Sequence, residues 1–374
     1  MKKHSKKIII TIICVIAMGS IFALKKDDKA TKKREIITKD SIMLMPMAMK
    51  TMQHGFPGSY EKIYYGIDEE GEMVWDVLNP QETSFLDEND KAKDTILMLS
   101  NKVYGELPFD QTTVTYKDSN LRKEILSLGS RVLSTKELVA LISTTQMGGN
   151  EVNQASYVYT EPELVGDKVF APTATIMGNE NYGIQDRHHR QKANYYWMSS
   201  VSTKESGMAG YISKCGVFAA LDKEVNTLSM RLTTNINSKM VVFVSQSTGV
   251  KNGKLGELMK VAQNQSYYEY KLTLEDTTQS VEVSNINCND REVLFDYLVS
   301  GNGNRLSAII TDEENKRILY YGQLADITMT KNGTATIVLP DDGKYHVSVF
   351  SEQYNGDKKT DYASKLIPIV LDEK

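Results

Sequence analysis

Cysteine is scarce in this sequence of 374 residues, which contains only three. One lies in an apolar N-terminal stretch, and the other two are Cys215 and Cys288. Three cysteines cannot build a disulfide framework, so a fold stabilised by several bridges is excluded. The remaining pair either forms a single bridge between domains or, as we expect, consists of two isolated buried thiols.

Motifs of common cofactor and metal sites are also missing. The sequence has no phosphate-binding loop, no G-x-G-x-x-G turn and no G-x-S-x-G elbow, and its acidic turns do not match a calcium loop. The adjacent His188 and His189 are a poor metal site, because neighbouring side chains of an extended chain point to opposite sides. We therefore expect no metal, no cofactor and no nucleophile at Ser199 or Ser200.

Basic residues are outnumbered by acidic ones over most of the chain. Residues 1–40 contain 11 Lys or Arg and 4 Asp or Glu, whereas the remainder contains 33 and 44. An acidic body repels a phosphate backbone, so we expect no nucleic-acid partner.

A long apolar run occurs at residues 8–24, directly after a cluster of lysines. Its length lies between that of a signal-peptide core and that of a minimal membrane-spanning helix. Residues 1–24 are therefore predicted to be a signal peptide or a membrane anchor. In either case the protein is expected to be extracytoplasmic, anchored through residues 8–24 or secreted.

Patterning divides the rest of the chain into four parts. Residues 25–54 form a charged, methionine-rich tether, residues 55–245 an α+β domain, and residues 246–265 a linker. Within the α+β domain, a hairpin is predicted at 62–78, and helices are predicted to begin near Ser119 and Ser134, the first ending at Gly129. Residues 266–374 contain about seven evenly spaced strands separated by Asn-Gly and Asp-Gly turns, typical of an immunoglobulin-like β-sandwich.

Six short segments of the α+β region occur in an order that a known family shares. They are VWDVLN (74–79), ILMLS (96–100), SNLRKEI (119–125), VLSTKEL (132–138), YYWMSS (195–200) and SMRLTTNIN (229–237). On these segments, residues 60–237 resemble a family of uncharacterised domains in surface proteins of Gram-positive bacteria, which has a Tyr-Trp-Leu-Arg-Ser signature. That family looks related to the C-type-lectin-like fold of formylglycine-generating enzymes.

The resemblance implies a C-type-lectin-like domain followed by an immunoglobulin-like sandwich. Met198 replaces the arginine of the signature, and Cys215 has no second cysteine in this region. The chemistry of the formylglycine-generating enzymes is therefore not implied.

Residues 186–200, DRHHRQKANYYWMSS, form the most distinctive cluster. We interpret its first seven residues as an exposed basic loop whose histidines charge at low pH, and its aromatic residues as a strand. Ligand binding is predicted for His188, His189, Arg190, Tyr195 and Tyr196. A fold-anchoring role is predicted for Trp75, Trp197, Ser199 and Arg231, with Glu124 or Glu137 as the partner of the buried arginine.

Long, polar, glycine-containing loops at 145–192 favour a non-catalytic binding or adhesion role, with an envelope glycan, the cell wall or a protein as ligand. Two alternatives stay open. One is a structural or assembly protein of the cell envelope. The other is an enzyme of unknown class, which would need His188 or His189 close to a carboxylate in a pocket.

Overall fold

The computed structural model is mainly β, with 48% strand and 13% helix. It describes residues 42–45, 48, 60–82, 95–113, 115–204, 207–224, 226–262, 269–340 and 344–371. The predicted anchor at 8–24 and most of the 25–54 tether lie outside these residues. No helix among the described residues is both long and apolar enough to cross a membrane.

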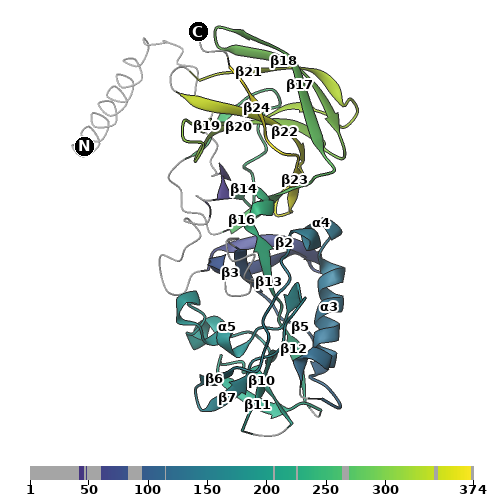
Figure 1. Cartoon of the computed structure of the whole chain (residues 1–374), viewed down its shortest axis with the longest axis vertical. Coiled ribbons are helices and arrows are strands. Elements are labelled where there is room, and N and C mark those ends of the chain that lie inside the picture. Colours follow the sequence, from purple (N-terminus) through teal and green to yellow (C-terminus); the bar gives the residue numbers. More distant parts are fainter. Residues whose placement is uncertain are drawn as a thin grey trace, which may run out of the picture. The chain divides into compact units, whose positions relative to one another are not determined.

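The predicted hairpin is part of a large mixed sheet (Figure 1). Strands β2 (Lys62–Asp68) and β3 (Gly71–Glu82) pair antiparallel, and β3 continues to β4 (Thr95–Ser100), β13 (Thr233–Asn237) and β8 (Val169–Phe170). All six residues of β4 are buried, as expected for a strand without alternation. This sheet provides one wall of the N-terminal core.

Two helices begin at the predicted serines. Ser119 caps α3 (Asn120–Val132) and Ser134 caps α4 (Thr135–Ala140) through a capping box with Glu137. The expected end at Gly129 is wrong, because α3 continues to Val132. Gly129 is needed for packing instead, since a Cβ there would lie 3.0 Å from Val169. The buried face of α3, including Leu121 and Ile125, completes the core.

A second sheet carries the aromatic segment. Its order is β11 (Phe218–Asp222), β10 (Met208–Ile212), β9 (Tyr196–Ser202), β12 (Thr227–Met230) and β5 (Tyr104–Pro108). The hairpin β6 (Glu151–Gln154) and β7 (Tyr157–Thr160) joins β9 through β7. Strand β9 is therefore central, which explains why its first five residues are all buried.

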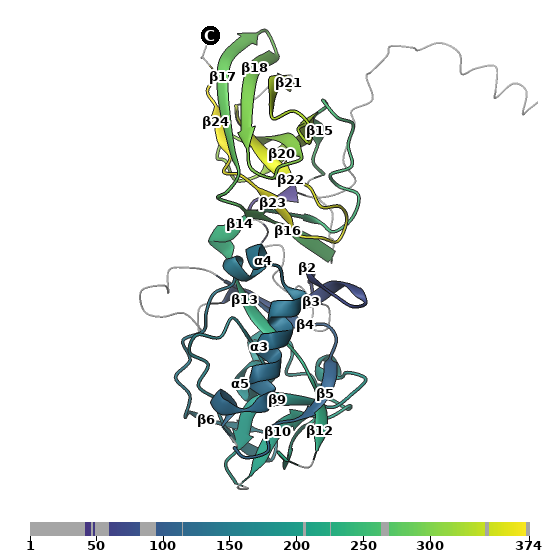
Figure 2. The same cartoon turned by 90° about the vertical axis from the view of Figure 1, so that its right-hand side faces the viewer.

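The C-terminal part is a two-layer β structure (Figure 2). One layer holds β19 (Arg305–Asp312), β20 (Ile318–Asp326), β22 (Tyr345–Gln353) and β24 (Ile367–Ile369). The other holds β17 (Ser280–Asn289), β18 (Glu292–Ser300) and β21 (Asn332–Val338). Side chains of both layers, such as Phe295, Ile310 and Val349, form one apolar cluster.

Residues 246–262, the described part of the linker predicted at 246–265, contribute to the β layers. Strand β14 (Val241–Gln246) pairs with β1 (Ile42–Met43) and with β16 (Glu269–Glu275), and β15 (Met259–Lys260) pairs with β20. The side chains of Val250, Lys251 and Val261 are buried. Because β16 also pairs parallel with β2, one 14-stranded sheet crosses the boundary expected at residue 245.

Candidate functional site

The histidine cluster is a short helix and not a loop. Asp186 accepts a hydrogen bond from the backbone of His188 at 2.9 Å and so caps α6 (Arg187–Arg190). The ring of His188 is exposed, whereas His189 is half-buried, with Nδ1 2.7 Å from the carbonyl of Gly183. Among the residues that the structure describes, no carboxylate forms a hydrogen bond or ion pair with the imidazole ring of either histidine, as a catalytic pair would require.

Arg190, for which ligand binding is predicted, does not lie on the surface. Its side chain is buried, with Nε donating to Gly216 O at 2.7 Å and Nη1 donating to Ile184 O at 3.0 Å. The guanidinium also lies 4.6 Å from the ring centre of Phe218. Arg190 therefore supports the neighbouring loops from inside.

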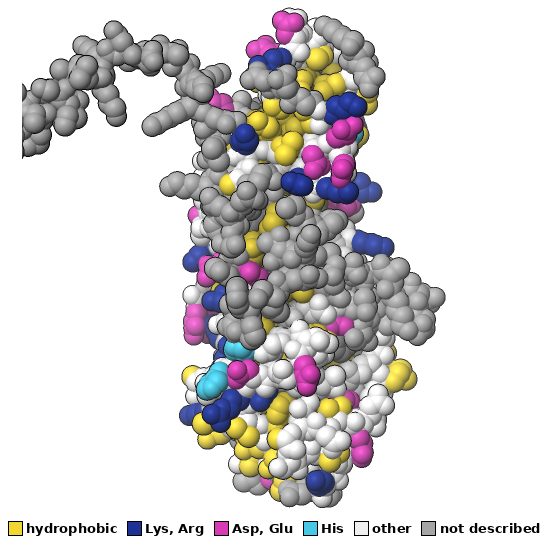
Figure 3. Space-filling model, turned by 90° about the vertical axis from the view of Figure 1, so that its left-hand side faces the viewer, with side chains coloured by type: hydrophobic (Ala, Val, Ile, Leu, Met, Phe, Trp, Pro, Cys, Tyr) yellow, Lys and Arg dark blue, Asp and Glu magenta, His cyan; other side chains and the backbone are white. Residues whose placement is uncertain are grey.

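The two tyrosines have different environments. Tyr196, for which ligand binding is also predicted, is fully buried, and its hydroxyl donates to Arg190 O at 2.9 Å. Tyr195 is exposed, with Lys214 Nζ 5.5 Å from its ring centre. Of these candidate residues, His188 and Tyr195 are the ones whose side chains are exposed to solvent. Figure 3 shows the histidines of this face close to a group of Lys and Arg side chains.

The four residues predicted to anchor the fold are all buried. Trp75 Nε1 donates to Tyr65 O at 2.7 Å, and Trp197 Nε1 donates to Leu107 O at 2.8 Å. The hydroxyl of Ser199 donates to Ala171 O at 2.9 Å, which is a structural role.

Arg231 has a different partner from the two glutamates that were expected. Its Nη2 lies 3.3 Å from Asp76 Oδ2, and its Nε donates to Ser100 O at 2.9 Å. Glu124 pairs with Arg131, and Glu137 caps α4. Asp76 was missed because it stands alone in an apolar strand, where an acid is usually exposed.

Lys192 shares the same carboxylate, since its Nζ lies 3.9 Å from Asp76 Oδ2. Burial, together with the positive charge of Arg231, lowers the pKa of Lys192 to about 8. The sequence predicts that this lysine belongs to an exposed basic loop, but only 16% of its side chain is accessible.

The loops at 145–163 form a pocket of about 320 Å³, which we call the Glu161 pocket. It lies beside β9 and the turn before α3. Its lining residues are Thr115, Tyr116, Lys117, Asp118, Met147, Gly148, Gly149, Thr160, Glu161, Pro162, Glu163, Ser199 and Val201.

Glycines set the path of the pocket wall. Gly148 and Gly149 have φ of 78° and 85°, in the left-handed region that favours glycine. A Cβ on Gly148 would lie 2.6 Å from the backbone nitrogen of Glu163. Gly149 N donates to Glu161 O at 2.9 Å, which holds the two segments together.

Glu161 is the distinctive group of this pocket, because it is only 5% exposed yet incompletely bonded. Its Oε1 accepts hydrogen bonds from Ser200 Oγ at 2.9 Å and from Thr175 N at 3.2 Å. Its Oε2 has no hydrogen-bond partner among the described residues. Burial raises the pKa of Glu161, although the hydrogen bond from Ser200 opposes that effect.

A larger cavity of about 670 Å³ lies beside α3, but its charged groups already neutralise one another. Lys102 Nζ lies 2.7 Å from Asp68 and 2.9 Å from Glu70, and Arg131 pairs with Glu124 at 2.8 Å. Since a bound ligand would have to displace these ion pairs, the Glu161 pocket is the better candidate site.

Two further observations concern reactive groups. The described residues contain no group of three or more His, Cys, Asp or Glu side chains that could hold a metal ion. Cys215 and Cys288 are both free. The expectation of two buried thiols is wrong for Cys215, which is exposed in the turn between β10 and β11.

Comparisons with known proteins do not identify a family for this chain. No family model matches the sequence, and no curated protein is significantly similar to it. Among solved structures, a β-glucuronidase from Ruminococcus gnavus in complex with an N1-substituted uronic isofagomine aligns with 8% identity and a TM-score of 0.16. The alignment covers 88% of this chain and 44% of that enzyme. A TM-score this low does not indicate a shared fold.

Proposed function

We propose that this chain is a cell-surface or secreted bacterial protein that binds a ligand without catalysis, and that the Glu161 pocket is its recognition site. The observation that carries the proposal is the buried Oε2 of Glu161, which has no described hydrogen-bond partner inside a pocket. A buried acceptor left without a partner is costly, so a donor from a ligand stabilises it.

The chemistry of the pocket favours a ligand rich in hydroxyl groups. Asp118, Glu161 and Glu163 supply carboxylate acceptors, while Lys117 is already paired with Glu163 at 2.9 Å. Such a set accepts hydrogen bonds from hydroxyl groups and repels anions. The volume is close to the lower end of the usual range for small-ligand sites, roughly 300–1,000 Å³. A single sugar unit of an envelope glycan fits both properties.

The architecture proposed for this function is a C-type-lectin-like domain of the Tyr-Trp-Leu-Arg-Ser family followed by an immunoglobulin-like sandwich. The largely β composition and the two-layer C-terminal part support it. Residues 8–24 would anchor the protein or direct its export, which would place the pocket outside the cytoplasm.

A structural role in the envelope is the second candidate. The observation that favours it is a buried cluster of four ionisable side chains in the C-terminal part, at Lys251, Lys271, Glu352 and Asp361. The two functions are compatible, since a surface protein needs both a recognition site and a stable body.

The pocket is tested by replacing Glu161 with Gln, which keeps the shape but turns one acceptor into a donor. Soluble peptidoglycan fragments and neutral oligosaccharides are titrated into the folded protein, and affinity is measured by calorimetry. We expect the wild-type protein to bind a glycan and Glu161→Gln to weaken binding roughly tenfold or more.

The matched control is Glu180→Gln, because Glu180 is an exposed glutamate outside the pocket lining. This variant should bind like the wild type. The proposal is overturned if a folded wild-type protein binds none of these glycans, or if Glu161→Gln binds them with unchanged affinity.

A further inference from the structure

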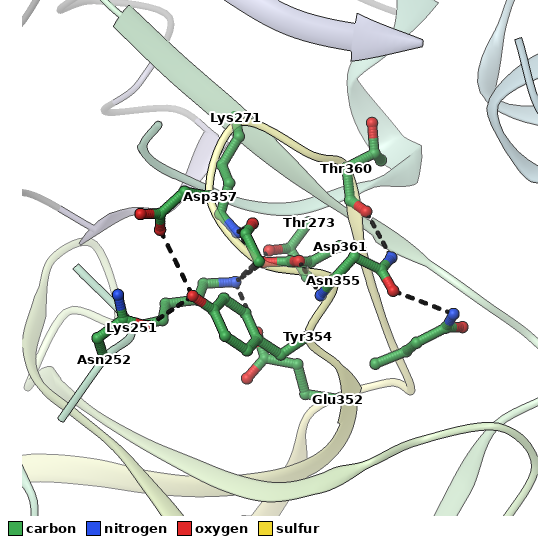
Figure 4. A network of polar contacts seen from close by, with 12 residues as sticks. Lys251, Asn252, Lys271, Thr273, Glu352, Tyr354, Asn355, Asp357, Thr360 and Asp361 are labelled. Atoms are coloured by element: carbon green, nitrogen blue, oxygen red, sulfur yellow. Dashed lines mark hydrogen bonds and ion pairs between the residues drawn. The ribbon is translucent and has the colours of Figure 1, made fainter. Parts of the chain in front are cut away.

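Three side chains with complementary reactivity meet inside the C-terminal part, away from the Glu161 pocket. Lys251 Nζ lies 2.7 Å from Asp361 Oδ2 and 2.5 Å from Glu352 Oε1 (Figure 4). All three side chains are fully buried. Lys251 comes from the segment after β14, Glu352 from β22, and Asp361 from β23 (Asp361–Ala363). Segments far apart in the sequence thus place an amine against a carboxyl group.

Aromatic rings enclose the amine. Lys251 Nζ is 4.6 Å from the ring centre of Phe243 and 6.0 Å from that of Tyr321. The hydroxyl of Tyr321 donates to Glu352 Oε2 at 2.7 Å, and Ser307 Oγ donates to the same atom at 2.8 Å. Glu352 is therefore fixed, with its other oxygen directed at the amine.

From this geometry we propose that Lys251 and Asp361 condense to an intramolecular isopeptide bond, with Glu352 as the proton relay. The reaction needs the neutral amine and the neutral carboxylic acid, which form when the Lys251 ammonium passes its proton to Asp361. Burial favours this neutral pair because burying charge is costly, whereas the carboxylates of Asp361 and Glu352 oppose it and raise the pKa of Lys251. The reacting groups are already in contact, which removes most of the entropic barrier.

The step balances without any cofactor. The lone pair of the neutral Lys251 Nζ attacks Cγ of the protonated Asp361, forming the C–N bond. Glu352 accepts a proton from the nitrogen and delivers it to the departing hydroxyl of Asp361. The C–O bond breaks, one water molecule leaves, and Glu352 is restored to its initial state.

A second lysine also contacts Asp361, but its surroundings suit a different role. Lys271 Nζ lies 2.7 Å from Asp361 Oδ2, and its other partner is the carbonyl of Gly356 at 2.7 Å. The other carboxylate partner of Lys251, in contrast, is Glu352. When Lys251 and Asp361 become a neutral amide, one positive and one negative charge disappear together. Lys271 and Glu352 then remain as a balanced pair.

The consequence is a covalent ring. The bond joins residues 110 positions apart in the sequence and connects the segment after β14 to β23. Unfolding of the C-terminal part would then leave a closed loop, which limits the entropy of the unfolded chain. This inference does not rest on the binding function of the Glu161 pocket.

The test uses the full chain, purified folded and then denatured and digested with trypsin for mass spectrometry. The wild-type protein is expected to yield a branched peptide that joins Lys251 to Asp361 and is lighter than its two parts by the mass of one water molecule. Lys251→Met, Asp361→Ala and Glu352→Gln should each give unbranched peptides of full mass.

Lys254→Met is the matched control, because Lys254 belongs to the same segment but its side chain is 75% exposed. It should retain the water loss and the branched link to Asp361. The proposal is overturned if the folded wild-type protein shows full mass at both peptides, or if the link contains Lys271 in place of Lys251. The wild-type result decides the matter even if a variant does not fold.

Discussion

The carboxylate of Asp76 is shared by two cationic side chains, the buried Arg231 and the half-buried Lys192. Arg231 approaches it at 3.3 Å and Lys192 at 3.9 Å, so one negative charge serves two positive ones. Arg231 has additional partners in Ser100 and Tyr196. Lys192 is therefore the weakly compensated member, and its charge is costly in the folded state.

We predict that Lys192→Met stabilises the protein at pH 7. A folded-state pKa of about 8, against 10.5 for the ordinary lysine, means that the unfolded chain binds more protons between these values. Stability of the wild type should therefore rise with pH from about 8 to about 10.5. The substitution should add about 1–3 kcal/mol at pH 7 and flatten that rise.

Urea denaturation from pH 7 to pH 10.5 measures both effects. Lys204→Met is the control, since Lys204 is exposed, and it should change the free energy of unfolding by less than about 0.5 kcal/mol. A lower stability of Lys192→Met at pH 7 would contradict this account of the charge.

The burial of Glu161 could not be predicted from the sequence. The loops around it were predicted to form a binding surface, and they do line a pocket. Nothing in the segment YTEPEL, however, distinguishes Glu161 from Glu163, which is more exposed. Burial of a polar residue depends on what the rest of the chain packs over it, and that information is not local.

At the scale of secondary-structure elements, the N-cap of a helix fixes where the helix begins and therefore which strands its buried face contacts. Ser119 Oγ accepts from Arg122 N at 3.1 Å, which fixes the first turn of α3 against Phe109 and Tyr116. The buried residues of α3 then face β8 and β2. A loose first turn would shift the whole helix relative to these strands.

We predict that Ser119→Ala lowers the free energy of unfolding by about 1 kcal/mol, because the N-terminal amide of α3 loses its acceptor. Ser130→Ala is the matched control on the same helix. Ser130 is exposed, and its hydroxyl only donates to the carbonyl of Leu126. Thermal denaturation should separate the two variants; an equal effect of both would show that the cap contributes nothing specific.

Elements with a regular pattern were predictable, and short ones were not. The hairpin, the caps of α3 and α4, and most C-terminal strands follow from alternation and turn residues. Helix α6 was read as a loop because four residues carry no helical period, although Asp186 is a usable capping signal. The segment 246–265 looked like a linker because its glycines and lysines conceal the buried Val250, Lys251 and Val261.

At the scale of the whole molecule, several contacts connect the N-terminal core to the C-terminal part in the residues described from 42 onward. Strand β16 pairs with β2, and its Tyr270 and Leu272 belong to the N-terminal core. Polar contacts add to this, because Glu137 of α4 accepts from Thr360 and Lys136 lies 2.6 Å from Asp276.

These contacts predict that the two parts unfold together. Differential scanning calorimetry of the full chain should give a single transition whose calorimetric and van't Hoff enthalpies agree. Two well-separated transitions would mean that the shared sheet does not couple the parts, despite the pairing of β16 with β2.

The claim on which the functional account depends most is that the ligand enters the Glu161 pocket. The most direct measurement is NMR: a glycan that binds in calorimetry is titrated into the isotope-labelled protein, and the changes in backbone amide chemical shift are assigned to residues. The account predicts that the largest shifts occur at the amides of residues 115–118, 147–149, 160, 161 and 163. Shifts centred on α6 and the turn between β10 and β11, or on the C-terminal sheets, would contradict it.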